Sequence, residues 1–335
     1  MSYKLGILDQ SPVIEGVSNF DTLQKTINLA KKAEEWGYER FWVSEHHNAD
    51  LVAGSSPEVL VSYLLAKTSS IRIGSGGVML QHYSPYKVAE NFHVLSTLEP
   101  GRVDLGIGKG PGGLPLSTKA LQYGKGNTGE DFEYRLTFLQ QLLNNSVPET
   151  HEFAGIKATP TPPTKPQTYL LGASVDSAKL AAELGISFAF AQFFNSDKEV
   201  LKEAAKTYHN NYSGGTFIVS VAVIAATTEE EAKTLAGKQK VVKVFLASGR
   251  KLTLQNVEQA EKFGKESGEA YEIKEFDADI IFGTPEQVKA NLDELHELYG
   301  VDEFILHTPV PSPEERLRSF KLLSPKYINQ LAMYS

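Results

Sequence analysis

The chain has 335 residues, of which 41% are hydrophobic, and its formal net charge is −8 at pH 7. This content suffices for one large barrel or two ordinary domains and argues against global disorder. Charges of both signs are scattered without a basic block, which excludes a nucleic-acid-binding surface, and the lack of cysteine excludes disulfides, thiolate metal sites and cysteine nucleophiles.

In the first half of the chain, short apolar runs alternate with amphipathic helical patterns. The predicted strands are residues 4–9, 40–44, 71–80 and 103–107, and the predicted helices are residues 21–36, 57–67, 85–98 and 130–143. Asp21 is expected to cap the first helix and Gly37 to end it, while Ser56 and Pro57 mark the start of the second. The N-terminal residues lack signal-peptide organisation, and no apolar run is as long as a membrane span, so a cytoplasmic protein is expected.

The alternation continues in the second half, after a proline-rich excursion over residues 144–166. The predicted strands are residues 168–171, 188–191, 217–225 and 303–307, and helices are predicted near residues 177–183, 198–208 and 285–298 and after Pro313. Residues 228–278 are charged and helix-rich in pattern. We interpret them as an insertion over the barrel mouth, because no Gly- or Ser-rich linker divides residues 1–335 into domains.

About eight strand–helix units result from this pattern. Strands that alternate with helices imply a parallel sheet with right-handed crossovers. Eight such units in a chain of this length favour a (β/α)₈ TIM-like barrel over a doubly wound sheet, with insertions at the C-terminal mouth of the strands.

The second predicted strand ends in Glu45, His46 and His47. Polar groups at the end of a buried strand are costly unless they have partners or a function, and ligands bind at the carboxyl ends of parallel strands. The three side chains could hold a metal with His82, provide a general acid or base, or simply support one another. Adjacent histidines in an extended segment point to opposite sides, so one of the pair faces the mouth easily. The residues alone leave these alternatives open.

Two glycine-rich stretches follow the second and third helices. Residues 74–77, Gly-Ser-Gly-Gly, lie inside the third strand and suit either a planar ring against bare backbone or a β-bulge at a tight barrel position. Residues 106–113 combine glycines with Lys109, which favours an anion cradle, a flexible lid, or both. Their spacing matches neither a Walker loop nor a dinucleotide fingerprint, since no helix is expected to begin there.

The next two strand ends carry further candidate binding residues. Ser174 is a natural N-cap after the fifth strand, and the free amides of the first helical turn, with the Ser177 hydroxyl, can bind phosphate. A plain N-cap is the alternative, and Lys109 on a neighbouring strand end favours phosphate. The sixth strand ends in Gln192, Phe193 and Phe194. Two aromatic side chains at the mouth suit an apolar substrate or a stacked ring, and core packing is the alternative.

Several of these segments, in this order, match one family. They are residues 8–12 (Leu-Asp-Gln-Ser-Pro), 38–47, 53–60, 71–80, 82–85, 88–90, 100–108 and 283–288. The chain therefore resembles the bacterial luciferase-like flavin-dependent monooxygenases, in particular their single-chain oxidoreductase branch. The resemblance runs nearly end to end and implies a (β/α)₈ barrel that binds FMN and usually forms a homodimer.

The resemblance also implies roles for individual residues. His46 matches the catalytic histidine that steadies the oxygenated flavin, and the Gly76–Gly77 peptide, preceded by Ser75, matches a cis peptide packed against the isoalloxazine ring. Lys109 falls where the family usually has a phosphate-binding arginine, so this chain offers a point charge in place of a bidentate fork. The helix start that completes the phosphate site is matched by Ser174, Val175 and Ser177.

The implied function is an FMN-dependent monooxygenase or oxidoreductase without a metal. Reduced FMN, supplied by a separate flavin reductase, would react with O₂ to a flavin C4a-peroxide, which His46 hydrogen-bonds and protonates or deprotonates. The substrate would be a small apolar organic compound such as an aldehyde. The alternatives are a deazaflavin-dependent reductase on the same barrel, a flavin-binding protein without turnover and a metal-dependent hydrolase. The resemblance implies that residues 228–278 carry the active-site lid, which varies within the family. They hardly match luciferase itself, so neither its substrate nor light emission is implied.

Overall fold

The computed structural model describes residues 1–335 except 125, 128, 238, 250, 255 and 335. Eight parallel strands of the described chain close into a barrel in the order β12, β1, β2, β3, β4, β5, β6, β7, with β7 paired to both β6 and β12. They are β1 (Lys4–Asp9), β2 (Arg40–Val43), β3 (Arg72–Met79), β4 (Val103–Gly108), β5 (Gln167–Gly172), β6 (Ser187–Ala191), β7 (Phe217–Ala225) and β12 (Glu303–His307). The predicted (β/α)₈ barrel is confirmed. A short strand that was not predicted, β11 (Ile281–Gly283), extends the sheet beside the end of β7.

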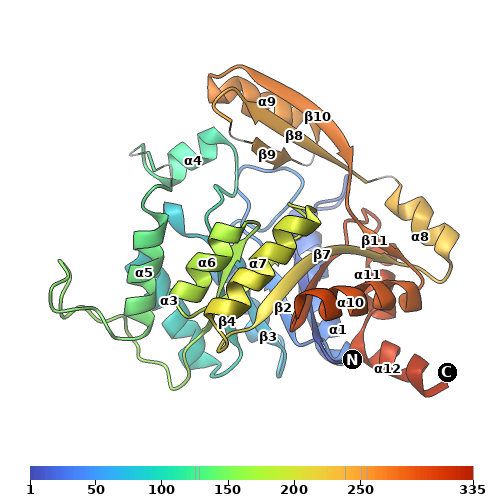
Figure 1. The fold of residues 1–335 in the computed structure, drawn as a ribbon, viewed down its shortest axis with the longest axis horizontal. Coiled ribbons are helices and arrows are strands. Elements are labelled where there is room, and N and C mark those ends of the chain that lie inside the picture. The colour runs from blue at the N-terminus through green and yellow to red at the C-terminus, as the bar shows by residue number, and fades with distance from the viewer. Residues whose placement is uncertain (125, 128, 238, 250, 255, 335) are drawn as a thin grey trace.

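Helices surround the barrel, and in Figure 1 α6 and α7 lie in front of the strands, between α5 on the left and α10 on the right. The helices are α1 (Asn19–Trp36), α2 (Pro57–Leu65), α3 (Pro85–Leu98), α5 (Phe132–Leu143), α6 (Val175–Glu183), α7 (Lys198–Asn211), α10 (Pro285–Tyr299), α11 (Pro313–Leu322) and α12 (Pro325–Tyr334). Their apolar faces pack on the outer surface of the strands and form the main core.

The first helix begins earlier than predicted, and its cap is Ser18, not Asp21. The Ser18 hydroxyl accepts the backbone N–H of Asp21 at 3.1 Å and donates to the Asp21 carboxylate at 2.6 Å. Asp21 therefore lies in the first turn, where a negative charge suits the helix dipole. Gly37 ends the helix as predicted, with a φ of 84°. Ser56 precedes α2 as predicted, but its side chain makes no capping hydrogen bond.

The N-terminal end of the barrel is filled by a buried network of charges. The Arg40 guanidinium, at the start of β2, donates to Asp104 at 2.6 Å and to Glu303 at 2.7 Å, and Arg72 donates to the other oxygen of Asp104. The indole N–H of Trp42 also donates a hydrogen bond to Asp104, at 3.0 Å. Buried charges are tolerated when each has hydrogen-bonded partners of opposite sign, and every charged group in this floor has them.

Above the floor, an inner apolar cluster fills the barrel. It consists of Leu8, Trp42, Tyr169, Ala189, Ile218 and Ile305, with Leu171 and Phe193 packed on it. These residues occupy alternate positions along their strands, as the side-chain period of a β-strand requires. The cluster separates the charged floor from the mouth, so polar groups at the mouth cannot be partnered from below.

Residues 228–278 differ from the helix-rich segment that was predicted, and residues 238, 250 and 255 of this range lie outside the described residues. The helices α8 (Glu229–Ala236) and α9 (Val257–Ser267) accompany an antiparallel sheet of β8 (Lys240–Leu246), β9 (Lys251–Leu254) and β10 (Tyr271–Asp277). The alternation of buried residues along β8 is the strand signal that the high charge obscured. The function of this segment as a lid stays a prediction.

The glycine-rich stretch after β4 leads into a helix that was not predicted, α4 (Pro115–Leu121). Pro115 at its first position is preorganised for a helix start, and Leu114 packs with residues of β8 and α9 such as Phe263. Figure 1 shows α4 beside the β8–β10 sheet, both above the barrel strands. Within the described residues, no helix combines the length and the apolar character needed to cross a membrane.

Candidate active site

Glu45, His46 and His47 lie at the mouth, just after β2. The Glu45 side chain is fully buried. Glu45 Oε1 accepts hydrogen bonds from the Tyr83 hydroxyl and from His47 Nε2, both at 2.8 Å. Its Oε2 accepts the backbone N–H of Met79 at 3.1 Å. Three donors compensate the desolvation of the carboxylate, so Glu45 and His47 form a fixed support for the segment.

The half-buried His46 has a different environment from its neighbour. Its backbone N–H donates to the Gly54 carbonyl at 2.8 Å. Burial lowers the pKa of His46 below its usual value and His47 adds to this, while Glu45 and the Gly112 carbonyl oppose the shift. The ring is therefore neutral near pH 7. A neutral imidazole has one N–H and one lone pair, so the ring can donate or accept a hydrogen bond.

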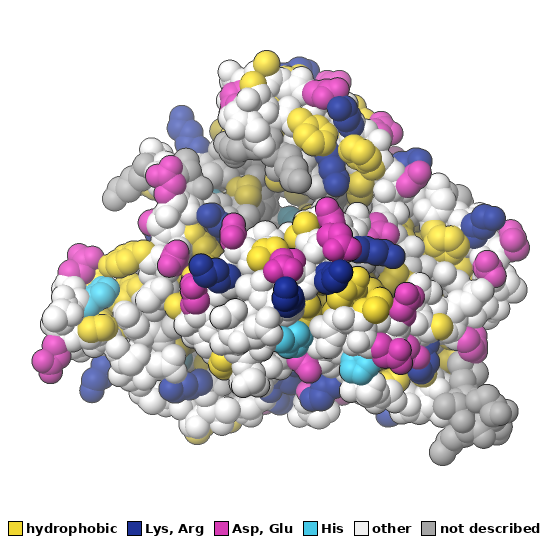
Figure 2. Space-filling view, in the orientation of Figure 1, with side chains coloured by type: hydrophobic (Ala, Val, Ile, Leu, Met, Phe, Trp, Pro, Cys, Tyr) yellow, Lys and Arg dark blue, Asp and Glu magenta, His cyan; other side chains and the backbone are white. Residues whose placement is uncertain are grey.

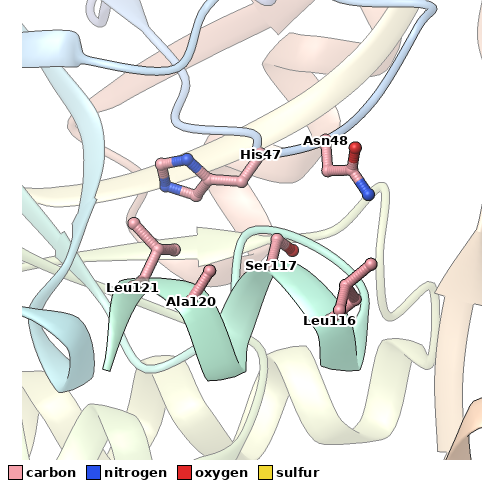
Figure 3. Close-up of a pocket in the computed structure, with 6 residues that line it drawn as sticks. All are labelled: His47, Asn48, Leu116, Ser117, Ala120 and Leu121. Atoms are coloured by element: carbon pink, nitrogen blue, oxygen red, sulfur yellow. The ribbon is translucent and has the colours of Figure 1, made fainter. Parts of the chain in front are cut away.

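His47 lines a pocket of about 480 Å³ between the loop after β2 and α4. Figure 3 shows its imidazole above the helix. The lining residues are His47, Asn48, Leu116, Ser117, Ala120 and Leu121. The two adjacent histidines thus differ, since the His47 ring is hydrogen-bonded to Glu45 and faces α4, while His46 is bonded through its backbone to Gly54.

His82, the third ligand of the metal interpretation, connects two loops. Its Nε2 donates to the Pro111 carbonyl at 2.8 Å, and its Nδ1 accepts a hydrogen bond from the Gln122 amide at 3.2 Å. Both ring nitrogens are therefore occupied within the chain. Among the described residues, no group of three or more His, Asp or Glu side chains is placed to hold a metal ion.

The glycines of β3 bring bare backbone to the mouth. The Gly76–Gly77 peptide is cis, as the resemblance implied, and the pairing of β3 with β4 shifts register at this point. A Cβ on Gly77 would lie 2.7 Å from the Gly106 carbonyl oxygen, so only glycine fits there, and one on Gly76 would crowd Trp42. The Ser75 hydroxyl is buried and bonds the backbone of Gly106 in both directions, which leaves only its backbone for a ligand.

The candidate phosphate-binding residues follow the adjacent strands β4 and β5. Ser174 is the N-cap of α6, as predicted, and its Oγ accepts the backbone N–H of Ser177 at 3.2 Å and lies 3.0 Å from the Ser177 hydroxyl. Val175 is the first helical residue. Lys109 is exposed, and its ammonium lies 6.0 Å from the centre of the Phe132 ring. These residues offer backbone N–H groups and a positive charge on one side of the mouth.

The residues after β6 provide an aromatic wall. Phe193 packs on the inner barrel cluster, and its ring centre lies 4.5 Å from that of Phe194 and 5.7 Å from that of His307. Phe194 is 48% exposed. Gln192 is buried and its Oε1 has no partner in the described chain. The predicted substrate wall thus contains one inner ring, one outer ring and one buried amide.

Five of the ten buried side-chain polar atoms that lack a partner among the described residues lie at the C-terminal ends of strands. They are Asp9 Oδ2, Ser44 Oγ, Gln192 Oε1, His307 Nδ1 and Thr308 Oγ1, and the other five belong to Thr22, His93, Ser96, Gln140 and Gln141 on the outer helices. Each buried donor or acceptor without a hydrogen bond costs about 1–3 kcal/mol. At the mouth, a ligand can supply the missing partners.

Comparison with known families decides the identity of this site. The family model described as luciferase-like monooxygenase matches residues 4–302. The chain belongs to the luciferase-like monooxygenase family. The resemblance inferred from the sequence is confirmed, and the chain is an oxidoreductase of the monooxygenase class.

Individual luciferase-like proteins agree over nearly the whole chain. The N-acetyl-S-alkylcysteine monooxygenase of Bacillus subtilis (strain 168) is 47% identical over 324 residues, which cover 96% of this chain and 97% of that protein. The crystal structure of apo-MsnO8 is 32% identical, covers 97% of this chain and 98% of its own, and superposes with a TM-score of 0.78.

Two more distant structures share the luciferase-like fold. The oxygenating constituent of 3,6-diketocamphane monooxygenase from Pseudomonas putida, in complex with FMN, is 17% identical with a TM-score of 0.71, and 98% of each chain is covered. An F420-dependent secondary alcohol dehydrogenase is 15% identical with a TM-score of 0.65, and 98% of this chain and 99% of that one are covered. At these identities the likeness concerns the fold alone.

Three side chains of this luciferase-like mouth were missed by the sequence analysis. Asp9 Oδ1 accepts hydrogen bonds from the Arg316 guanidinium at 2.8 Å and from the Ser11 backbone N–H at 3.1 Å. Burial, reinforced by Arg316, lowers the pKa of His307 to about 4. Asp9 and His307 each end a predicted strand, the signal that singled out His46, and could have been found by it. Arg316 lies inside a helix and gave no such signal.

Proposed function

We propose that this chain is a reduced-FMN-dependent monooxygenase that uses O₂ to oxygenate a small organic substrate. The observation that carries the proposal is the group of buried, unpartnered polar atoms at the barrel mouth. His46 follows β2 at the same end of the barrel, and Gly76 and Gly77 lie in the last half of β3. Membership of the luciferase-like family and the FMN complex of a chain with the same fold support this cofactor.

The residues present fit a flavin mononucleotide. The isoalloxazine ring would lie against the backbone of Ser75, Gly76 and Gly77, where side chains are absent or turned away. The phosphate would bind the free amides at the start of α6, next to Ser174 and Ser177, because the first N–H groups of a helix lack intrahelical acceptors and carry partial positive charge. Lys109 would add a full positive charge.

Reduced FMN supplies the electrons for the activation of O₂ when it is bound. His46 would then transfer the proton, since the lone pair of its neutral ring can accept a proton and its N–H can hold a hydrogen bond at the reacting oxygen. The inner apolar cluster, which includes Trp42 and has Phe193 packed on it, excludes water from the bottom of the site.

The substrate proposed from the aromatic wall is a small organic compound with an apolar part. Phe193 and Phe194 after β6 provide contact surface for it. The B. subtilis relative, at 47% identity, is named for N-acetyl-S-alkylcysteine. We therefore propose thioethers of this class as the first compounds to test, ahead of aldehydes.

A deazaflavin-dependent reductase is the second candidate, because an F420-dependent dehydrogenase shares the fold. A flavin-binding protein without turnover is the third. Anaerobic titration of the chain with FMN, reduced FMN and F420 separates these candidates by affinity. Consumption of O₂ by the reduced-FMN complex, with an oxygenated product from an N-acetyl-S-alkylcysteine, supports the monooxygenase. Tight binding of F420 alone contradicts it, and FMN binding without product from any thioether or aldehyde supports the third candidate.

The phosphate site is tested by a matched pair of N-cap variants. Ser174→Ala and Ser312→Ala each remove a serine whose Oγ accepts a backbone N–H of its helix. We expect both to lower the free energy of unfolding by about 1 kcal/mol. Only Ser174→Ala should also weaken FMN binding, by several-fold, in a fluorescence titration. Equal FMN affinity in the two variants would place the phosphate elsewhere.

The proposed partners are a separate flavin reductase and a second copy of the chain. The neighbouring helices α2 and α3 expose Val59, Tyr63, Val94 and Leu98 by 43% to 66%. Large apolar side chains gathered on one face suit a subunit interface. Light scattering should give a dimer, and Leu98→Lys should shift the population toward the monomer.

We also propose that the protein is cytoplasmic and that it has no nucleic-acid partner. The net charge of the chain is negative, and Figure 2 shows acidic and basic side chains mixed on one face of the molecule.

A further inference from the structure

The segment between β4 and α5 is fastened through His82 to the short turn that follows β3. His82 Nε2 donates to the Pro111 carbonyl at 2.8 Å, and the Gln122 amide donates to His82 Nδ1 at 3.2 Å. Pro111 precedes α4 and Gln122 directly follows it, so one imidazole holds both ends of this helix. Residues 125 and 128 of the same segment lie outside the described residues.

The hydrogen-bond pattern fixes the tautomer of His82. The Pro111 carbonyl can only accept, so the proton of the neutral ring is on Nε2. The Gln122 amide is oriented by Asn127, whose backbone N–H donates to Gln122 Oε1 at 2.5 Å and whose carbonyl accepts from Gln122 Nε2 at 2.8 Å. The amide therefore turns its N–H groups toward His82 Nδ1, which must act as an acceptor.

A second proton on His82 would break this arrangement. The Nδ1–H group would then face the N–H groups of Gln122, and two donors cannot share a hydrogen bond. Rotation of the amide would turn its oxygen toward His82, but it would set donor against donor and acceptor against acceptor in both contacts with Asn127. Only the neutral ring therefore fastens both ends of α4.

The titratable groups that face His82 come from the segment after β2 and from its own neighbour in the chain. Glu45 and His47 follow β2, and the centre of the His47 ring lies 6.3 Å from that of His82. The Tyr83 ring centre lies at 6.1 Å. Burial lowers the pKa of His82 and His47 adds to this, whereas the Pro111 carbonyl and Glu45 oppose the shift. The ring is therefore neutral at pH 7 and gains its second proton below about pH 6.5.

The hydrogen bonds continue from Asn127 to α5 and return to the residue beside His82. The side-chain amide of Asn127 donates to Asp131 at 2.9 Å. Arg135 on α5 donates to the other oxygen of Asp131 at 2.7 Å and to the Tyr83 carbonyl at 2.9 Å. The segment is thus held at two places by a closed circuit of hydrogen bonds, and His82 is the member of this circuit that can change its charge near neutral pH.

Lys109 lies against this circuit. Its stem passes close to Gly129, since a Cβ on that glycine would lie 3.4 Å from Lys109 Cε. The backbone N–H of Gly129 is in turn held by Asn127 Oδ1 at 2.7 Å. Loss of the circuit would free the backbone on which the lysine stem rests. A lysine that is no longer held binds a fixed phosphate more weakly, because ordering it costs conformational entropy.

We propose that His82 is a positioning residue of the cofactor site: in its neutral form it fastens the segment around α4 so that Lys109 is held for the flavin phosphate, and its protonation releases this segment. The inference rests on the proposed function, because Lys109 acts there on FMN. It adds a dependence on pH, since binding that requires the neutral imidazole competes with the proton. FMN affinity should therefore fall as the pH falls.

The test measures the affinity for FMN by fluorescence titration at about pH 8 and about pH 5, on either side of the ordinary histidine pKa. The proteins are the wild-type chain, His82→Gln, His82→Leu and His209→Gln. The glutamine amide can still donate to the Pro111 carbonyl but does not titrate, whereas leucine does neither. His209 Nε2 also bonds a carbonyl, that of Tyr299 at 3.2 Å, but near the end of α7 outside the barrel, so its variant is the matched control.

The wild-type chain should lose about three- to tenfold more FMN affinity between the two pH values than His82→Gln, the effect of one hydrogen bond. The titration of the phosphate itself is shared by all four proteins and cancels in this comparison. At the higher pH, His82→Leu should bind FMN about three- to tenfold more weakly than wild type, and His82→Gln should lie close to wild type. His209→Gln should follow the wild-type chain. Riboflavin, which lacks the phosphate, should bind all four proteins alike.

Hydrogen exchange provides a second measurement that needs no flavin. In the free chain at the higher pH, peptides within residues 109–124 should exchange faster in His82→Leu than in the wild type and His82→Gln. At the lower pH, after correction for intrinsic exchange rates, the wild-type peptides should exchange as fast as those of His82→Leu. Peptides of α7 should be unchanged by either substitution of His82, which separates release of the segment from a general loss of stability.

Several results would overturn the proposal. They are an equal pH dependence of FMN affinity in the wild type and His82→Gln, an unchanged FMN affinity in His82→Leu, and equal exchange of residues 109–124 in all four proteins. Equal losses for FMN and riboflavin in His82→Leu also contradict it, because Lys109 acts on the phosphate. A wild-type chain that binds no FMN at either pH contradicts the proposed function instead, and hydrogen exchange still decides whether His82 fastens the segment.

Discussion

The two ends of the barrel treat buried polar groups in opposite ways. At the N-terminal end, Arg40, Asp104 and Glu303 are almost fully buried, and each makes short hydrogen bonds to a partner of opposite sign. At the C-terminal end, Asp9 and His307 also hold buried polar atoms, yet one atom of each lacks a partner in the described chain. The inner apolar cluster lies between the two layers.

This difference separates groups that stabilise the fold from groups that await a ligand. A satisfied buried network costs little once formed, and removing one member exposes the others to the full desolvation penalty. An unsatisfied group lowers stability in the free chain and regains the loss when a ligand binds. Substitution of a buried polar residue should therefore lower the free energy of unfolding at the N-terminal end, whereas substitution of an unpaired one at the C-terminal end should leave it unchanged or raise it.

The largest effect is expected at the floor of the barrel. Arg40→Met leaves Asp104 and Glu303 buried without their cation, so the free energy of unfolding should fall by about 3–5 kcal/mol. Urea denaturation measures it. Lys32→Met, which breaks an exposed ion pair with Glu35, serves as the control and should change stability by less than about 1 kcal/mol. Equal losses of stability in the two variants would show that the charged floor does not stabilise the fold more than an exposed ion pair does.

At the mouth, the largest effect should be on turnover. His46→Asn removes the basic ring nitrogen, so the rate of substrate oxygenation should fall by about 10²- to 10³-fold while FMN affinity changes little. His47→Asn breaks the hydrogen bond to Glu45. This variant should lower the free energy of unfolding, and its rate of oxygenation should fall less than that of His46→Asn. Steady-state kinetics with saturating reduced FMN measure the first effect. A larger loss of rate in His47→Asn would reverse the assignment of the two histidines.

Acidification should act on both ends of the barrel, because burial raises the pKa of Glu303 in the floor and lowers the pKa of His307 at the mouth. The pKa of His307 is lowered to about 4 in the folded chain, against about 6.5 when unfolded. Between these pH values the unfolded chain binds a proton at His307 that the folded chain does not bind. The contribution of neutral His307 to the free energy of unfolding is therefore complete above about pH 6.5, and it declines as the pH falls toward 4.

The loss should reach at most about 3 kcal/mol, at about 1.4 kcal/mol per pKa unit. His307→Asn should flatten the decline between pH 6.5 and pH 4 in urea titrations. The charges of Asp9 and Arg316 are not changed by this substitution, so they act as an internal control. An identical pH profile in the variant would show that His307 titrates normally.

The sequence predicted the barrel because its signals are local. Alternating strand and helix patterns, together with breakers such as Gly37, define each unit independently of the rest. The prediction failed in the charged segment that contains β8, whose residues Val242, Val244 and Leu246 are buried on alternate positions, with Lys243 and Phe245 between them. The cap of α1 was misassigned because Ser18 and Asp21 are both good caps, and only the backbone decides which one precedes the helix.

The candidate site was predictable where a residue ends a strand and where the family resemblance points to it. His46 and Ser174 meet both conditions. The partners of such residues come from distant segments, for example Tyr83 for Glu45 and Arg316 for Asp9, and no spacing in the chain reveals these pairs. Which polar atoms lack partners can be known only from the fold, so this feature of the mouth was not predictable.

The smallest expected effect compares the same substitution at a satisfied and an unsatisfied buried serine. Ser319 Oγ accepts the backbone N–H of Ala225 at 2.9 Å, whereas Ser44 Oγ has no partner among the described residues. Ser319→Ala should lower the free energy of unfolding by about 1–2 kcal/mol, because the Ala225 N–H stays buried without an acceptor. Ser44→Ala should leave it unchanged or raise it by up to about 1 kcal/mol. Parallel urea titrations measure both, and a matching loss in Ser44→Ala would mean that its hydroxyl already has a hydrogen-bond partner.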